Sequence, residues 1–151
     1  EVAGMDRCGF FAHDEPVADV AEGYTRQSGH GDGELRSNVL MMPAKGSPAG
    51  SAMCTAGDLL TFDGALRNHH LTSPGWTAGV FGGPAPEAGT AGDGPPGRLE
   101  VGAGLAGGAP GVSAAVEIEG PLVVIVLANL DAPVAERIAE AIMLELRAAL
   151  N

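Results

Sequence analysis

The clearest alternation of apolar and polar residues lies in the last third of the chain. Residues Val112–Glu119 alternate between an apolar set and a set that contains Ser113 and Glu117. A period of two with one polar face predicts a half-covered strand whose glutamates face solvent unless a cationic partner covers them. A Gly-Pro pair then predicts a reversal. The next stretch, Leu122–Ala128, is apolar on both faces, which is typical of a central strand covered on each side.

A helical pattern follows these two predicted strands. Asp131 and Pro133 are start signals, and Ile138, Ile142 and Leu146 repeat at helical spacing. They predict a buried stripe with nearby alanines, including Ala135, Ala139 and Ala149. The residues predicted to face water are charged: Glu136, Arg137, Glu140, Glu145 and Arg147. Two strands need cover to be stable, so the sequence predicts an α+β fold, an antiparallel sheet with this helix packed on one face.

Two shorter helices are predicted upstream, and they form a small helical segment. Thr55 and Asp58 make a capping box, and the apolar positions Leu59, Phe62 and Leu66 (beside Leu60 and Ala65) predict a buried helix face to about residue 68. Ser73 followed by a proline then predicts a second helix that ends near Val80.

The rest of the chain is rich in residues that interrupt helices and strands. Residues 1–46 are predicted to be loops with short ordered pieces, and residues 82–97 hold six Gly and four Pro in sixteen positions, which predicts a linker. Arg98–Ala103 is a candidate strand followed by a glycine-rich turn. We therefore expect one domain in three parts: loops and helices at 1–81, a linker at 82–97, and strands with the terminal helix at 98–151.

Composition limits the function classes. At 151 residues the chain can bury one core, but only 4% of its residues are aromatic while 24 are glycine. The core is therefore expected to consist mainly of Ala, Val, Leu and Ile, with modest stability or dependence on a partner. The net charge of −11 argues against nucleic acid and anionic membrane surfaces as partners.

The cysteines and the length of the apolar runs indicate in which cellular compartment the chain is expected. Cys8 and Cys54 fit no C-x-x-C or zinc pattern, so two free thiols in a reducing, cytoplasmic compartment are expected, although their pairing stays open. No 18-residue apolar run predicts a membrane span. The first residues contain neither a basic nor an apolar region, so no signal peptide is expected in this chain.

Several segments resemble, in order, the β-lactamase-related serine hydrolases, in the branch of class C β-lactamases, penicillin-binding proteins and esterases. Residues 47–67 are similar to the family's P-A-G-G-x-x-S-T-A-x-D-L-x-x-F-x-x-A-L run, and Gly4–Phe10 to its L-G-M-x-x-T-x-F turn. Gly107–Val112 resembles the turn between two sheet strands. The resemblance implies the C-terminal part of a β-lactamase-like domain that begins in mid-domain.

The motifs that carry the family's chemistry are missing or altered. The single lysine, Lys45, follows Met42 at the spacing where S-x-x-K needs a serine, and the single tyrosine, Tyr24, starts no Y-x-N. We therefore predict no catalytic residue. In the family a G-H-G-G-G-A-P-G stretch forms the substrate wall and an oxyanion turn. Here Leu105 takes the basic position of that wall, and the resemblance carries the wall role to Leu105, Gly107, Gly108 and Ala109.

Other chemistry has weaker support. Ser47 and Ser51 stand near glycines but break the G-x-S-x-G order, so they are low-ranking candidate nucleophiles. His69 and His70 are adjacent and share no helix face, and joining His13 with His30 would require tertiary proximity. No metal site and no cofactor are predicted, and no phosphate-binding glycine motif occurs.

Three hypotheses about function remain. The chain is the C-terminal portion of a serine hydrolase that is inactive alone and joins a complementary N-terminal segment. Alternatively, it is a non-catalytic descendant that binds a ligand or protein. In the third hypothesis it is a structural protein that self-associates as a homo-oligomer, because a truncated sheet leaves an open edge.

Overall fold

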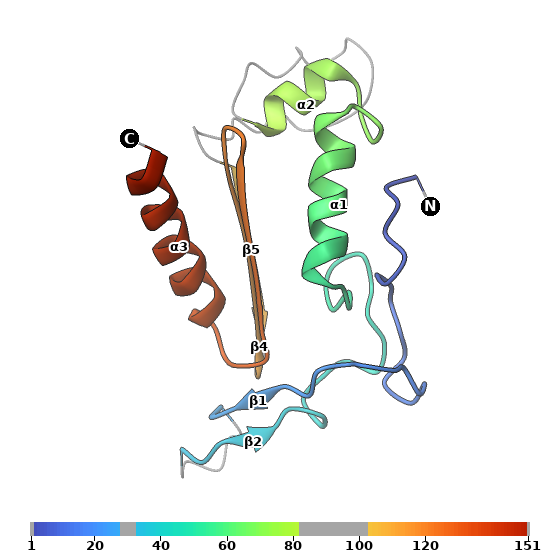
Figure 1. Cartoon of the computed structure of the whole chain (residues 1–151). Helices are drawn as coiled ribbons and strands as arrows, with labels where there is room; N and C mark the ends of the chain where they lie inside the picture. The colour runs from blue at the N-terminus through green and yellow to red at the C-terminus, as the bar shows by residue number, and fades with distance from the viewer. Residues whose placement is uncertain (1, 28–32, 82–102, 151) are drawn as a thin grey trace.

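Three antiparallel strands form the main sheet, and a helix lies against each of its faces. The computed structural model describes residues 2–27, 33–81 and 103–150. In Figure 1 the sheet is seen edge-on, with α3 on one side and α1 on the other. The elements in chain order are β1 (Tyr24–Thr25), β2 (Arg36–Ser37), α1 (Ala56–Arg67), α2 (Pro74–Val80), β3 (Ala103–Ala109), β4 (Val112–Glu119), β5 (Leu122–Ala128) and α3 (Val134–Leu150). The predicted α+β class is confirmed.

The hydrophobic core lies between α3 and the sheet. Its fully buried members come from β4, β5 and α3, and partly buried aliphatic residues pack around them. As expected, the core is aliphatic and contains no aromatic ring, although Met143 was not foreseen. The core consists of Ala115, Val124, Ala135, Ala139 and Met143, with Leu122, Val126, Ala128 and Leu146 around it. Alanine at three of the five buried positions (115, 135 and 139) lets the helix approach the strands closely.

The buried face of β4 is the opposite of the one that the alternation suggested. Ser113 and Ala115 are buried beneath α3, whereas Val112, Ala114 and Val116 are only partly covered. Ser113 can be buried because its hydroxyl has a hydrogen-bond partner. Its Oγ accepts from the Ala135 amide at 3.2 Å. That amide belongs to the first turn of α3, where backbone donors lack helical partners.

One glutamate of the same face, Glu119, has a cationic partner. Arg147 on α3 is exposed, as predicted, and its Nε donates to Glu119 Oε2 at 2.7 Å, while its Nη2 also pairs with this carboxylate. The Arg147 guanidinium therefore has a pKa raised above its ordinary value, chiefly by the hydrogen bond to Glu119. A cationic partner thus lies over the strand.

The predicted stripe of α3 is rotated in the structure. Ala135, Ala139 and Met143 are buried, whereas Ile138 and Ile142 are 44% and 43% exposed. Small alanines and one flexible methionine fit against the sheet, and the bulkier isoleucines lie at the side of the helix. Ala149 is also exposed.

The two edges of the sheet differ from the prediction. β3 begins at Ala103 and includes the glycines that were expected to form a turn; residues 98–102 and the predicted linker at 82–97 lie outside the described residues. A strand ladder pairs backbone groups, so Gly and Ala can join it despite low strand propensity. β5 is covered by a helix on each face, but in the described strand order β3-β4-β5 it is an edge strand rather than a central one.

The helices α1 and α2 match their predicted limits, and Ala65 and Leu66 of α1 are buried as predicted, but the rest of the predicted face differs. Asp63 is 5% exposed, whereas Leu60 and Phe62 are 52% and 37% exposed. Asp63 is buried because Arg67, one turn later, donates to its carboxylate at 2.7 Å.

Candidate functional site

The residues assigned to the substrate wall lie together on β3, the other edge of the sheet. β3 pairs with β4 alone among the described strands, with Leu105 opposite Val116 and Ala109 opposite Val112. Leu105 is 69% exposed. Because side chains alternate along a strand, Leu105, Gly107 and Ala109 share one face and Gly108 lies on the other.

The two glycines of this edge differ in their surroundings. A Cβ at Gly107 would meet no atom within 4 Å, so the backbone there is open. A Cβ at Gly108 would lie 3.1 Å from the Cβ of Ala132. The face of Gly108 is therefore closed by the chain that leads into α3, while the Leu105 face stays accessible.

Asp131 fixes the end of this hairpin. Its carboxylate accepts hydrogen bonds from the Gly111 amide at 2.8 Å, the Thr25 hydroxyl at 2.7 Å and the Arg26 amide at 2.9 Å. The Gln27 side-chain amide adds a fourth donor at 3.1 Å. One side chain thus joins the β3–β4 turn to β1. The sequence predicted that Asp131 marks the start of the last helix; in the structure its carboxylate accepts hydrogen bonds from these four donors.

These donors also set the charge of Asp131. Partial burial acts to raise its pKa, but the hydrogen bonds from Arg26, Gly111, Thr25 and Gln27 outweigh it and hold the pKa below its ordinary value. The carboxylate is therefore ionised at neutral pH and serves as an acceptor only.

Asn38 holds the same turn from the other side. Its side-chain amide donates to the Pro110 carbonyl at 2.9 Å, and its backbone amide donates to Gly23 at 2.9 Å. Asn38 is 5% exposed. Gly111 has a φ of +77°, and a Cβ there would lie 2.9 Å from the Cβ of Asn38. The turn therefore requires glycine for its backbone conformation and for this close approach.

Tyr24, the single tyrosine, does not face the β3 edge as a proton acceptor. Its hydroxyl donates to Glu22 Oε2 at 3.2 Å. The negative charge of Glu22, followed by this hydrogen bond, raises the pKa of Tyr24 above its ordinary value. The phenol therefore stays protonated at neutral pH.

The two candidate serines lie in a separate tight turn. Ser47 and Gly50 exchange backbone hydrogen bonds at 2.9 and 2.8 Å, and the Ser47 hydroxyl accepts from the Ala49 amide. Ser51 has a φ of +65°. Within residues 33–81 and the other described ranges, no hydrogen bond joins either hydroxyl to a histidine, lysine or carboxylate. Their nucleophilic role stays a low-ranking prediction.

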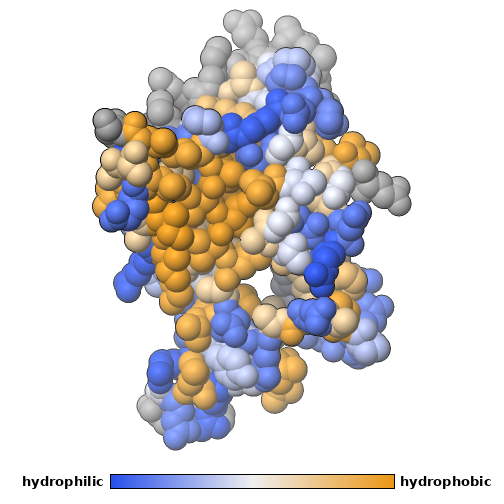
Figure 2. Space-filling view, viewed as in Figure 1, coloured by the Kyte–Doolittle hydropathy of each residue, from blue (hydrophilic) through white to orange (hydrophobic). Residues whose placement is uncertain are grey.

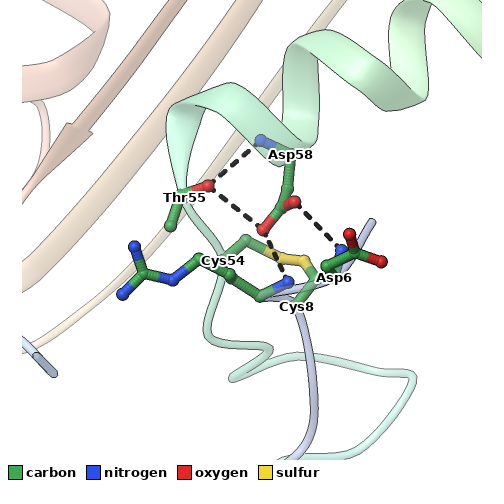
Figure 3. Close-up of a disulfide and its surroundings, with 6 residues drawn as sticks. Asp6, Cys8, Cys54, Thr55 and Asp58 are labelled. Atoms are coloured by element: carbon green, nitrogen blue, oxygen red, sulfur yellow. Dashed lines mark hydrogen bonds between the residues drawn. A yellow bond between two sulfur atoms is a disulfide. The ribbon is translucent and has the colours of Figure 1, made fainter. Parts of the chain in front are cut away.

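The start of α1 is tied to the N-terminal segment by a disulfide and a carboxylate. Cys8 and Cys54 form a disulfide, so the expectation of free thiols was wrong, and the cytoplasmic assignment loses that support because disulfides persist in oxidising compartments. Figure 3 shows Asp58 beside this bond, accepting from the amides of Asp6 and Arg7 at 3.2 and 3.1 Å. The two cysteines were 46 positions apart with no motif between them, so their meeting depends on tertiary structure.

The same close-up confirms the predicted cap. The Thr55 hydroxyl accepts from the Asp58 amide at 3.1 Å and donates to the Asp58 carboxylate (Figure 3). Asp58 therefore serves both its own helix and the segment before Cys8.

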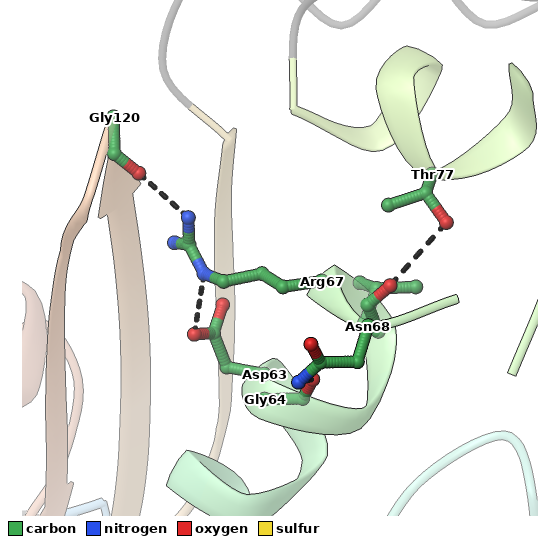
Figure 4. A network of polar contacts seen from close by, with 7 residues as sticks. Asp63, Gly64, Arg67, Asn68, Thr77 and Gly120 are labelled. Atoms are coloured by element: carbon green, nitrogen blue, oxygen red, sulfur yellow. Dashed lines mark hydrogen bonds and ion pairs between the residues drawn. The ribbon is translucent and has the colours of Figure 1, made fainter. Parts of the chain in front are cut away.

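Arg67 ties the other end of α1 to the sheet. Its guanidinium lies between Asp63 and the carbonyl of Gly120 in the β4–β5 turn, at 2.7 Å from each (Figure 4). It also stacks over the Phe81 ring, with 4.5 Å from the guanidinium carbon to the ring centre. These contacts set the separation between α1 and the strands.

Across residues 2–27, 33–81 and 103–150, no three His, Cys, Asp or Glu side chains gather in a way that could hold a metal ion. His30 lies outside these ranges. Within the same ranges, no helix combines the length and apolarity needed to cross a bilayer.

No family model and no curated protein matches the sequence. Among solved structures, the chain is similar to the crystal structure of a penicillin binding protein from Bacillus halodurans, with 25% identity and a TM-score of 0.72. The match covers 98% of this chain but 46% of that one, so the chain spans less than half of its length. The fold is thus that of the β-lactamase and penicillin-binding protein superfamily, without assignment to one branch.

The hydrogen bonds by which Asp131 and Asn38 hold the β3–β4 turn form a clamp that the sequence did not predict. Thr25, Gln27 and Asn38 come from a segment that was predicted only as loop, and their partners lie 72 to 106 positions away. A polar residue in a loop gives no signal of a partner so distant. The buried state of Asn38 could be recognised only from the structure.

Proposed function

We propose that the chain is the C-terminal portion of a β-lactamase-related serine hydrolase and does not turn over substrate alone. The observation that carries this proposal is the β3 edge. It retains an open backbone at Gly107 but presents the apolar Leu105 where the hydrolase branch has a basic residue. An open strand edge can bind a substrate through its backbone, as in peptide recognition by strand addition.

The reaction would need groups that these residues do not provide. Acyl transfer requires a nucleophile with an adjacent base. Lys45 and Tyr24 do not stand in the family's motifs, and the raised pKa of Tyr24 opposes its use as a base. A complementary segment with S-x-x-K and Y-x-N would have to supply the chemistry, while β3 would supply one wall.

The test is hydrolysis of p-nitrophenyl acetate and of a chromogenic cephalosporin by the purified chain. A fluorophosphonate probe, with the adduct read by intact mass, reports any activated serine. We expect neither turnover nor adduct. A stoichiometric adduct that disappears in Ser47→Ala or Ser51→Ala would overturn the proposal and identify the nucleophile, and Ser37→Ala is the matched control.

A further inference from the structure

β3 is held by its backbone rather than by its side chains. Six of its seven residues are glycine or alanine, and the other one, Leu105, is 69% exposed. Residues 104–109 contribute no member of the core cluster between α3 and the sheet. Among the described strands, β3 pairs with β4 alone. The side-chain packing that fixes β4 and β5 against α3 therefore does little to fix the position of β3.

The turn that ends β3 is held from outside the sheet by the clamp. The Gly111 amide donates to the Asp131 carboxylate at 2.8 Å. The Pro110 carbonyl accepts from the side-chain amide of Asn38 at 2.9 Å. Pro110 and Gly111 are the whole connection between β3 and β4, and so short a connection sets the twist and register of the strands it joins. The clamp therefore acts on the end of β3 that carries Gly107 and Gly108.

Asp131 is itself fixed by three donors from one segment. They are the Thr25 hydroxyl at 2.7 Å, the Arg26 amide at 2.9 Å and the Gln27 side-chain amide at 3.1 Å. Thr25 is fully buried, and its hydroxyl also accepts from the Gln27 amide at 2.9 Å. Hydrogen bonds to an ionised carboxylate are among the stronger ones in proteins, so they hold this side chain in the orientation in which it meets Gly111.

The segment that carries these donors is attached mainly by polar contacts. In Figure 2 the broad hydrophobic surface lies over α3 and β5, whereas hydrophilic residues predominate below it, over β1 and β2. The backbone amide of Tyr24 donates to Asn129 at 2.9 Å, and the Asn129 side chain donates to Glu22 at 3.0 Å. The clamp is thus part of a hydrogen-bonded junction and not of the apolar core.

Close packing leaves the turn little room to move. A Cβ at Gly23 would lie 2.5 Å from the carbonyl oxygen of Gly111. On the other side, a Cβ at Gly108 would lie 3.1 Å from the Cβ of Ala132, the residue after Asp131. The same short stretch, residues 131–132, therefore holds the turn and backs the wall.

We propose that Asp131 and Asn38 are positioning residues for the wall, because they set where the backbone of Gly107 and Gly108 lies. Thr25 acts on the wall through Asp131. The role rests on the proposed function, in which β3 supplies one wall of the site. Groups that bind a reacting substrate must be held within about 0.5 Å of the productive geometry. A wall without packed side chains needs bonds from elsewhere to meet this requirement.

A clamp that merely stabilises the fold would behave differently when it is weakened. Gly107 and Gly108 would keep their native positions, and exchange in β3 and β5 would rise together through global opening. A positioning clamp, once weakened, lets β3 move within the folded state while the core stays as it is.

Nuclear magnetic resonance of the isotope-labelled chain separates these cases in Thr25→Val, which removes the hydroxyl and keeps the shape of the side chain. Of two neighbouring residues in an antiparallel pair, one directs its N–H to the partner strand and the other directs it away. Gly107 and Gly108 therefore report on the ladder and on the open edge. We expect both amide shifts to move, and the ladder amide to exchange about tenfold faster relative to Val124. The amide shifts of Val124 and Ala139 should stay at their wild-type values.

Two controls accompany this variant. Thr25→Ser keeps the hydroxyl and should retain the wild-type shifts of Gly107 and Gly108. Thr77→Val is the matched control, because Thr77 is 3% exposed and its hydroxyl donates to the Leu66 carbonyl at 3.3 Å. It removes a comparable buried bond far from the β3–β4 turn and should leave both glycine amides unchanged.

Unchanged shifts of Gly107 and Gly108 in Thr25→Val would overturn the proposal, and so would equal acceleration of exchange in β3 and at Val124. If Thr25→Val does not fold, Gln27→Ala removes one exposed donor to Asp131 and should move the same two amides by a smaller amount. None of these readouts uses turnover. Hydrolysis by the chain alone would therefore count against the proposed function only, and an unmoved β3 against the positioning role only.

Discussion

The segment before α1 and the sheet with α3 are held together by different forces. Between α3 and the sheet, stabilisation comes from buried aliphatic side chains and continuous strand ladders. The described residues before α1, 2–27 and 33–54, contribute no member of that core cluster. The Cys8–Cys54 bond holds the first of these residues beside the start of α1, and Asp58 and the polar contacts of Asn38 and Asp131 attach them to the rest of the fold.

The difference indicates which conditions affect each region. Apolar packing responds to the volume of core side chains, whereas a disulfide responds to reductant and a carboxylate to pH. The N-terminal segment should therefore be released under conditions that leave the sheet intact.

The largest expected effect is loss of the disulfide. Replacing Cys8 and Cys54 together with serine opens a loop with a sequence separation of 46 residues, and the chain-entropy model gives a loss of about 4 kcal/mol. Urea unfolding with and without reductant measures it. Hydrogen exchange should show faster exchange in residues 2–54 and little change in β4 and β5.

The wild-type chain under reductant and the double variant should give the same results in urea unfolding and in hydrogen exchange. Simultaneous loss of protection in β5 would show that the two regions are one cooperative unit and would remove the distinction between them.

Next in size is a cavity in the sheet region. Met143 is 1% exposed, so Met143→Ala should lower the free energy of unfolding by about 3 kcal/mol. The control Leu144→Ala, at a position that is 62% exposed, should cost about 0.5 kcal/mol or less. Equal urea midpoints for the two variants would contradict the assignment of the core.

The smallest of the three effects concerns Asp131. Asp131→Asn removes an ionised acceptor from four donors and should cost about 2 kcal/mol. Since the folded pKa is below its ordinary value, the stabilisation is present above the unfolded pKa of about 3.9. It is lost as the pH falls through the folded pKa.

Urea midpoints between neutral pH and acid give the readout for this carboxylate. The wild type should lose stability on acidification more steeply than Asp131→Asn. Asp19→Asn is the control, because Asp19 is 80% exposed in its ion pair with Arg7, and it should follow the wild type. Parallel curves for all three would exclude Asp131 as the acid-sensitive group.

Local patterns in the sequence predicted the elements well. The limits of α1, α2 and β4 followed from Thr55, from the Ser73-Pro74 pair and from strand alternation, because caps and periodicity act over a few residues. The faces were harder to predict. Ser113 is buried because it accepts from Ala135, and Asp63 because Arg67 covers it, and neither partner is evident from hydrophobicity.

The site was predicted only in part. The structure places Leu105 and Gly107 on β3, where the sequence predicted a glycine-rich turn, and the wall role that the resemblance gives them stays a prediction. The clamp of Asp131 and Asn38 could not be predicted, since it joins residues that no local pattern connects. The disulfide was missed for the same reason.

The span of the clamp also has a consequence for synthesis of the chain. Thr25 is 106 positions before Asp131, so at about 5 to 20 residues per second it is made roughly 5 to 20 s earlier. The side chain of Asn38 likewise has no partner until Pro110 is made, 72 positions later. On the ribosome, the segment around Thr25 is therefore anchored to the β3–β4 turn only after the sheet has been made, whereas Cys8 meets Cys54 much earlier.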